Sequence, residues 1–387
     1  MHKKRVEYRL ELYLRQHNLL MSTKIFSFFS GAGFLDLGFE NSGYDVVFAN
    51  EIIGDFAKGY RYSRKMMGKE PPKYGLCEGD IRDFLSAPQK NALLKKQVYA
   101  EKELGDLVGF IGGPPCPDFS VAGKNRGAEG KHGVLSQVYM DLICDVSPDF
   151  FLFENVKGLW RTSKHRVFFD HLVEQAEKSG YCVSYRLVNA LEYGAPQDRD
   201  RILLFGVKSN LLPKGESSKF MNLFPWESEG WISLSQIKAM PWPSASGEAL
   251  LRCPSDCDIR LTVSHWFEKN DVENHPNAKD YFKPKAALEK MKYIVEGDVS
   301  RKAYKRLHRW RYSPTVAYGN NEVHWHPWLQ RRISVAEALA LQSLPKEYIL
   351  PPDITLSAKF KTIGNGVPYC LAFSIAKCIN IFLNNLT

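Results

Sequence analysis

The sequence predicts an α/β fold, a doubly wound and mostly parallel sheet with a second, smaller and irregular domain. Two observations support this prediction. Between Lys24 and about Val207, helical patterns alternate with short apolar runs, which are "KIFSFF" at 24–29, "VVFAN" at 46–50, "DLVGFIGG" at 106–113, "DFFLFEN" at 149–155 and "RILLFGV" at 201–207. Runs without polar alternation are typical of strands that are buried on both faces of a parallel sheet. From 209 to 327 the chain is instead rich in Pro, Trp, Ser and charge, without a clear period.

These changes of pattern predict four segments along the chain. Residues 1–23 form a basic amphipathic extension, 24–208 the sheet domain, 209–327 the irregular domain, and 328–387 a return to the first domain. The return contains a helical pattern, "SVAEALALQSLP", and ends in "TIGNGVPYCLAFSIAKCINIFL", whose apolar face we expect to pack on the sheet domain. The extension is interpreted as a docking helix, with a nucleic-acid contact as the alternative.

Composition limits the class of protein. The 387 residues are 44% apolar, which is enough for a full core. No apolar run approaches the roughly 20 residues that span a bilayer, and "MHKKRVEYRLELYLRQ" does not resemble a signal peptide, so we expect a soluble, intracellular protein without a membrane partner. The net charge of +9 suits a nucleic-acid partner, although the excess is modest.

Cysteine spacing argues against a metal site. The eight cysteines include no CxxC pair, which disfavours both a disulfide framework and structural zinc. Cys253 and Cys257 bracket "PSD" and could ligate a metal, but no second pair follows them. We therefore expect no metal.

A glycine turn and an acidic residue indicate a cofactor. The stretch "FSGAGFLDLGFENSGYDVVFANE" places Gly31 and Gly33 between a strand and a helix, with Glu51 at the end of the next strand. Glycines let a ligand approach a helix amino terminus, and an acid at this distance can bind ribose hydroxyls, so an adenosine-containing cofactor is predicted. The spacing is not GxGxxG, and such turns also occur without a ligand. Asp80 follows a probable third strand and either accepts from an exocyclic amine or caps a helix.

The stretch "IGGPPCPDFSVAG" at 111–123 places the thiol of Cys116 on a segment with restricted backbone conformation. Pro115 and Pro117 flank Cys116 and restrict the backbone around it, directly after a core strand. A preorganised thiol near a base is a nucleophile once deprotonated. A buried structural cysteine is the alternative.

Charged residues follow the neighbouring strands. Glu154 ends "FLFEN" and could share a proton with a substrate ring nitrogen, or could merely cap a turn. We expect it on the same rim as Cys116, because adjacent parallel strands end at one edge. "GAPQDRDRILLFGV" brings Gln197, Arg199 and Arg201 to that edge, where the arginines could order a carboxylate or hold a phosphate.

Taken together, these blocks resemble the cytosine-C5 DNA methyltransferases of bacterial restriction-modification systems. The glycine turn with Glu51, "GDI", "PPCPDFS", "ENV", "QDRDR", "RRISVAEALALQSLP" and "IGNGVP" are similar to that family's blocks in their usual order, over roughly 24–207 and 313–372. The resemblance implies a Rossmann-like, S-adenosylmethionine-dependent methyltransferase whose residues 209–327 are a target-recognition domain. It also implies Cys116 as nucleophile, Glu154 as partner of cytosine N3, and Arg199 and Arg201 as active-site organisers.

The resemblance also implies two sets of binding residues. Those assigned to S-adenosylmethionine are Phe29, Gly31, Gly33, Glu51, Ile52, Asp80, Ile81, Pro115 and Asn365. Those assigned to DNA are Ser120 on a mobile loop of about 117–135, the cations Arg301, Lys302, Lys305, Arg306, Arg309 and Arg311, and Thr315 beside the flipped base. Ile52 stands where the family often has a large aromatic residue, and "GAGF" replaces "GxGG". A solvated basic helix face remains the alternative for the cationic run, which contains no acid.

The activity implied is methylation at C5 of a flipped-out cytosine in a specific duplex sequence, through a covalent cysteine adduct. We expect a monomer in the bacterial cytosol or nucleoid, accompanied by a restriction endonuclease without stable contact. Three other functions are alternatives. An RNA cytosine methyltransferase shares the fold, but that branch usually has threonine where Ser120 stands; a nicotinamide oxidoreductase lacks GxGxxG here; and a noncatalytic DNA-binding protein would have no need for Cys116 or Glu154.

Overall fold

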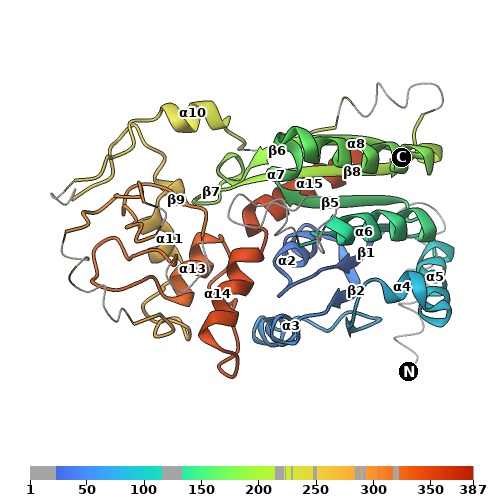
Figure 1. Cartoon of the computed structure of the whole chain (residues 1–387), viewed down its shortest axis with the longest axis horizontal. Coiled ribbons are helices and arrows are strands. Elements are labelled where there is room, and N and C mark those ends of the chain that lie inside the picture. Colours follow the sequence, from blue (N-terminus) through green and yellow to red (C-terminus); the bar gives the residue numbers. More distant parts are fainter. Residues whose placement is uncertain are drawn as a thin grey trace, which may run out of the picture.

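The computed structural model describes most of the chain. The described residues are 23–115, 133–213, 222, 224–227, 230–246, 251–283, 289, 293–301, 303–316 and 322–386. Figure 1 shows a sheet flanked by helices on one side of the molecule and a region of long irregular segments on the other.

Seven strands form the central sheet, in the order β3-β2-β1-β4-β5-β8-β6. Their bounds are Thr23–Phe28 for β1, Asp45–Glu51 for β2, Leu76–Glu78 for β3, Leu107–Gly112 for β4, Phe150–Val156 for β5, Tyr181–Asn189 for β6 and Asp200–Lys208 for β8. Strands β1 to β5 pair in parallel, whereas β8 runs antiparallel to both of its neighbours. The prediction of a doubly wound, mostly parallel sheet is therefore confirmed, and each of the five predicted apolar runs coincides with a strand.

Helices cover both faces of this sheet. The helices of the sheet region are α2 (Phe34–Asn41), α3 (Gly54–Met66), α4 (Asp83–Ser86), α5 (Pro88–Glu103), α6 (Gly133–Val146), α7 (Gly158–Arg161) and α8 (Ser163–Lys178). Side chains of α2 and of the C-terminal helix α15 (Tyr369–Asn384) share one apolar cluster with one sheet face. Side chains of α5, α6 and α8 share a second cluster with the opposite face. The predicted return of the chain end to the sheet is thus confirmed.

The carboxyl-terminal part has one stretch apolar enough to span a membrane. Among the described residues, Leu356–Asn384 passes this test by length and composition. It consists of α14 (Leu356–Asn365) and α15, which are separated by Gly366, Val367 and Pro368. Since the apolar side chains of α15 lie in the sheet core, packing accounts for its composition.

Among its described residues, the irregular region contains little regular structure. Its elements are the 3-10 turns η3 (Ser209–Leu211) and η4 (Ile259–Leu261), the helices α10 (Leu234–Ala239) and α11 (Val263–Lys269), and the strand β9 (Ser313–Pro314), which pairs with β7 (Gln197–Asp198). The 3-10 turn η2 (Ala190–Tyr193) and α13 (Val335–Leu341) adjoin it.

The proposed domain boundary at 327 and 328 does not separate two cores. Trp266 and Leu307 share an apolar cluster with Leu339 of α13 and Phe34 of α2. The division into four segments stays a prediction, and residues 1–22 of the first segment lie outside the described residues.

Candidate active site

Most of the described residues predicted for catalysis and cofactor binding lie at one edge of the sheet. Strands β1, β2, β4 and β5 run in parallel, so their carboxyl ends meet at the same edge, which we call the rim. Ligands bind beyond such an edge in open α/β sheets. The rim therefore gathers the glycine turn, Glu51, Pro115 and Glu154 from four separate strands.

The turn after β1 has an unusual backbone. Phe29, Gly31 and Gly33 have φ values of 53°, 58° and 84°, all in the left-handed region that side chains rarely adopt. A Cβ on Gly33 would come within 2.9 Å of the Tyr60 ring beneath it, so only glycine fits there. A Cβ on Gly31 would meet no atom within 4 Å, which leaves space against the backbone of the turn.

Glu51 joins this turn to the loop after β2. Its Oε2 accepts a hydrogen bond from the Gly31 N–H at 2.9 Å, and its Oε1 accepts from the Ile53 N–H at 2.7 Å. Burial raises the pKa of the Glu51 carboxyl, while these N–H groups act against the rise. Each oxygen keeps a second lone pair for a ligand hydroxyl. Beside it, Ile52 is 60% exposed and offers an apolar surface at the rim.

The other predicted cofactor residues differ in accessibility. Asp80 accepts from Arg82, at 2.9 Å from the backbone N–H and 3.0 Å from Nε, and this neighbour holds the pKa of the Asp80 carboxyl below its ordinary value. Ile81 is buried, whereas Pro115 and Asn365 are exposed. The carboxylate of Asp80 thus caps its own turn, whereas the N-cap of the following helix α4 is Arg82, without a side-chain cap.

Glu154 is buried at the rim and paired with a cation. Its Oε1 lies 2.5 Å from Nε of Arg201, which reaches it from the neighbouring strand β8. A Cβ on Gly113 would lie 2.5 Å from the other carboxylate oxygen, so the absence of a side chain there makes room for Glu154. Asn155 Nδ2 donates to the Pro114 carbonyl at 3.3 Å. The carboxylate is therefore fixed against the segment that leads into the predicted nucleophile.

Arg199 and Arg201 each have a separate set of partners. Arg199 is 2% exposed, and its Nη2 donates to the carbonyls of Gly364 and Gly366 at 2.7 and 3.0 Å. These glycines flank Asn365, so Arg199 fixes the end of α14, while Arg201 contacts Glu154. Whether Arg199 organises catalysis stays a prediction.

Several predicted residues lie outside the described residues. They are Cys116, Ser120 and Lys302, together with residues 117–132 of the predicted mobile loop. The described chain leads up to this loop through Pro114 and Pro115.

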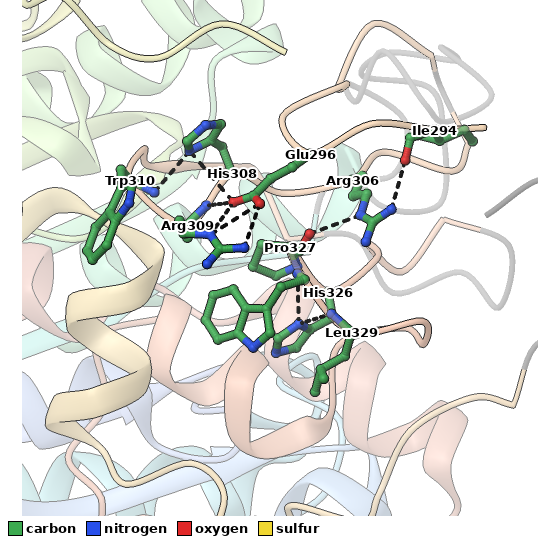
Figure 2. A network of polar contacts seen from close by, with 10 residues as sticks. Ile294, Glu296, Arg306, His308, Arg309, Trp310, His326, Pro327 and Leu329 are labelled. Carbon is green, nitrogen blue, oxygen red and sulfur yellow. Dashed lines mark hydrogen bonds and ion pairs between the residues drawn. The ribbon is translucent and has the colours of Figure 1, made fainter. Parts of the chain in front are cut away.

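The cationic run between 299 and 312 is held largely by internal contacts. Arg306 donates to the carbonyls of Ile294 and Pro327 at 2.9 and 3.0 Å, and Arg309 forms a two-pronged pair with Glu296, with Nη2 at 2.9 Å from Oε2 (Figure 2). Arg301 is exposed. The described part of the run forms no helix, so the alternative of a solvated helix face is wrong for these residues.

The remaining DNA candidates lie near the junction with the sheet. Arg311 Nη1 lies 3.4 Å from the Pro243 carbonyl, and Lys305 is half-buried. Thr315 Oγ1 donates to the Asp198 carbonyl at 2.7 Å, which places this threonine next to Gln197 and the end of β7.

Sequence reasoning missed Asn189 and Glu337. Asn189 caps η2 and binds two carboxylates of the "QDRDR" block. Glu337 accepts from the N–H of Ser334, the N-cap of α13, and pairs with Arg331. Both residues belong to capping boxes, "NALE" at 189–192 and "SVAE" at 334–337, and this spacing was a readable signal.

Fold and rim together are those of an α/β protein whose candidate ligand site lies at the carboxyl ends of its strands. A model of the family described as C-5 cytosine-specific DNA methylase matches residues 23–380. The chain belongs to this family, and it is a DNA (cytosine-5-)-methyltransferase of the type II restriction-modification class.

Individual relatives agree with this assignment. The chain is 52% identical over 377 residues to type II methyltransferase M.NmeDI of Neisseria meningitidis serogroup C, a match that covers 97% of this chain and 87% of the relative. It is 29% identical over 379 residues to M.FnuDI of Fusobacterium nucleatum, covering 92% and 94%. Among solved structures, a mutant of Spodoptera frugiperda DNMT2 has a TM-score of 0.56 at 15% identity, with 94% and 100% covered, and shares the fold.

Proposed function

We propose that the enzyme transfers a methyl group from S-adenosylmethionine to C5 of a flipped-out cytosine in a specific duplex DNA sequence, through a covalent adduct with Cys116. The observation that carries the proposal is the position of Glu154, buried at the rim opposite Gly113 and paired with Arg201. This carboxylate lies against Gly113, and Cys116 follows Gly113 by three residues in the sequence. A proton-sharing group and a nucleophile at one rim are what addition to a pyrimidine ring requires.

The cofactor site fits an adenosine-containing methyl donor. The open space over Gly31, the lone pairs of Glu51 and the exposed face of Ile52 suit a backbone contact, a ribose and an adenine ring respectively. When bound, S-adenosylmethionine supplies an electrophilic methyl group to the rim. Asp80 is the weakest member of the predicted set, because Arg82 already occupies its carboxylate.

The residues of the chain supply the activation of the base. The Cys116 thiolate adds to C6 and breaks the C5–C6 double bond, while a proton shared between Glu154 and N3 stabilises the charge that develops on the ring. C5 becomes nucleophilic and would take the methyl group as the S–CH3 bond of the donor breaks and leaves S-adenosylhomocysteine. Loss of the C5 proton then restores the double bond and expels the thiolate, which returns the enzyme to its starting state.

The substrate must be extrahelical for this reaction. C6 of a stacked cytosine is out of reach of a side chain, so the base leaves the duplex at a cost of a few kcal/mol. We assign duplex DNA as the partner, with a monomeric enzyme acting in the bacterial cytosol or nucleoid. We also infer a companion restriction endonuclease that makes no stable contact.

Trapping with a fluorinated base tests the mechanism. A duplex with 5-fluorocytosine at the methylated position should form a covalent adduct, since fluorine cannot leave as a cation to allow elimination. Peptide mapping should place it at Cys116, and Cys116→Ser should abolish it while S-adenosylmethionine binding stays within about threefold, a change of under 1 kcal/mol. Cys77→Ser is the matched control, because Cys77 is a half-buried cysteine in β3 beside the rim.

Three results would contradict the proposal. They are an adduct on another residue, turnover by Cys116→Ser at the wild-type rate, and trapping on RNA but not on duplex DNA. The last result would move the enzyme to the RNA-modifying branch of the fold.

A further inference from the structure

Two aspartates flanking Arg199 share one buried amide. Asn189 Nδ2 donates to Asp198 Oδ1 at 2.8 Å and to Asp200 Oδ1 at 2.7 Å. Asn189 is 1% exposed, and its Oδ1 accepts from the Leu191 N–H at 3.0 Å. The side chain thus has a fixed position, and both of its ends are engaged.

Asp200 connects this amide to the active-site strand. It pairs with Lys157 Nζ at 2.6 Å, three residues beyond Glu154 at the end of β5. Burial would raise the pKa of the Asp200 carboxyl, but Lys157 and Asn189 hold it below its ordinary value. Asp200 is also the residue before Arg201, whose Nε contacts Glu154.

Asp198 connects the same amide to the irregular region. Its carboxylate pairs with Lys238 of α10. Its backbone pairs with β9, and its carbonyl accepts from Thr315 Oγ1. Glu192 adds a second link, because its Oε2 accepts from the Asn189 N–H at 2.8 Å and its Oε1 accepts from the Leu234 N–H at 3.2 Å.

The Asp198–Lys238 pair also faces the loops of the cationic run. It lines a pocket of about 140 Å³ together with residues of those loops, Gly297, Val299, His308, Arg311, Tyr312 and Pro314. A DNA group that enters this pocket would meet Lys238 and Arg311 directly. The pair is therefore placed to respond to DNA, if the proposed function is correct.

The Asn189 amide lies between two carboxylates of like charge, those of Asp198 and Asp200. Two carboxylates of like charge repel each other, and one neutral amide and two lysines compensate them here. Because the amide serves both carboxylates at once, displacement of one changes the geometry available to the other.

We propose that Asn189 is a positioning residue that couples the seating of α10 on the sheet to the orientation of Glu154. The inference rests on the proposed function, since it assumes that DNA is bound beside α10 and that Glu154 acts on the cytosine. In this arrangement, DNA read in the irregular region adjusts Lys238 and Asp198, and the change reaches Lys157 and the end of β5 through Asn189 and Asp200.

A double-mutant cycle tests the coupling. Lys157→Met and Lys238→Met are combined in the full-length enzyme, and single-turnover methylation of the bound duplex is measured. In the wild-type background we expect the methylation rate of the double variant to differ by about threefold or more from the rate that the product of the two single effects predicts. In an Asn189→Ala background the effects should become multiplicative. Lys178→Met, which breaks an exposed pair with Glu174 on α8, is the matched control. It should leave the methylation rate unchanged in both the wild-type and the Asn189→Ala background.

A second readout separates positioning from a purely structural role. Asn189→Ala should lower the ratio of rates between the methylated site and a duplex changed by one base pair, by about fivefold. A structural role would reduce the amount of active enzyme and leave this ratio unchanged. If Asn189→Ala fails to fold, Asp198→Asn serves instead, because it removes the charge at a partly exposed position and should also weaken the coupling.

The outcomes distinguish this inference from the proposed function. The coupling would be overturned if the effects of Lys157→Met and Lys238→Met on the methylation rate simply multiply in the wild-type background. It would also be overturned if their deviation from the product is undiminished in both Asn189→Ala and Asp198→Asn. Adduct formation at Cys116 with fluorinated DNA in these same variants would show that the chemistry stands independently of it.

Discussion

The sheet region (residues 23–208) and the irregular region (209–327) are stabilised in different ways. The sheet region has paired strands and two apolar clusters, and its functional side chains lie at the rim. The irregular region has short helices and long segments, which are joined by contacts such as Glu296 with Arg309 and Arg306 with two carbonyls (Figures 1 and 2). The comparison teaches that a preorganised rim suits one fixed reaction, while loops held by side chains can change what they bind without disturbing the sheet.

The largest effect is expected from Glu154→Gln. The amide keeps the size of the carboxylate but cannot share a proton with N3 and loses the ion pair with Arg201, so the charge that develops on the ring is less stabilised. Methylation should fall by about a hundredfold or more, while DNA affinity stays within about threefold. Rapid-quench methylation and a binding titration measure the two quantities.

Glu174→Gln, an exposed change on α8, is the control for this substitution and should have no effect. Equal losses of rate and affinity in Glu154→Gln would indicate that Glu154 is structural.

The sheet region could be predicted from the sequence to a greater extent than the irregular region. Buried parallel strands have continuous apolar runs, so β1, β4 and β5 were predictable, whereas the edge strand β6 carries Ser184 and Arg186 and was missed. The order of the rim residues followed from the parallel topology.

Side-chain partners could not be predicted in the same way. Arg199 and Arg201 are two residues apart in sequence, yet one binds the end of α14 and the other Glu154. Likewise, Arg306 binds backbone carbonyls, and Arg309 binds Glu296, which is distant in sequence. No local sequence pattern predicts these partners. Only the capping boxes at Asn189 and Glu337 left a local signal.

A second prediction concerns pH and the junction between the regions. Burial would raise the pKa of the Glu337 carboxyl, but Arg331 and His326 hold it at about 2, below its ordinary 4.5. A carboxyl whose pKa is lower in the folded than in the unfolded state stabilises the protein at pH values above the unfolded-state pKa. This stabilisation is lost as pH falls from about 4.5 towards 2. Glu337→Gln should therefore lower the free energy of unfolding at pH 7 by at most about 3 kcal/mol.

Urea unfolding of wild type and Glu337→Gln at a series of pH values measures this. The difference between the two proteins should shrink below pH 4.5. A difference that is constant with pH would show that the ionised carboxylate is not responsible. Glu268→Gln, an exposed change on α11, provides the control.

The smallest effect separates two arginines of the cationic run. Arg301 is exposed, so Arg301→Ala should weaken all DNA sequences alike and reduce the slope of log affinity against log salt by about one unit. Arg309 is paired with Glu296, so Arg309→Ala should loosen the loop and leave the salt slope nearly unchanged. Titrations with methylated-site and scrambled duplexes at several salt concentrations test both, and a slope that changes equally in the two variants would contradict the distinction.

The central claim is that the sheet region performs the chemistry and the irregular region chooses the site. Exchange of residues 209–327 for those of a family member with a different site tests it most directly, with buried side chains facing α13 such as Trp266 and Leu307 retained. Methylated cytosines are then mapped at base resolution in DNA from cells that express the chimera. The account predicts methylation at the donor's site, with adduct formation still at Cys116. Methylation that remains at the recipient's original site, by a folded and active chimera, would contradict it.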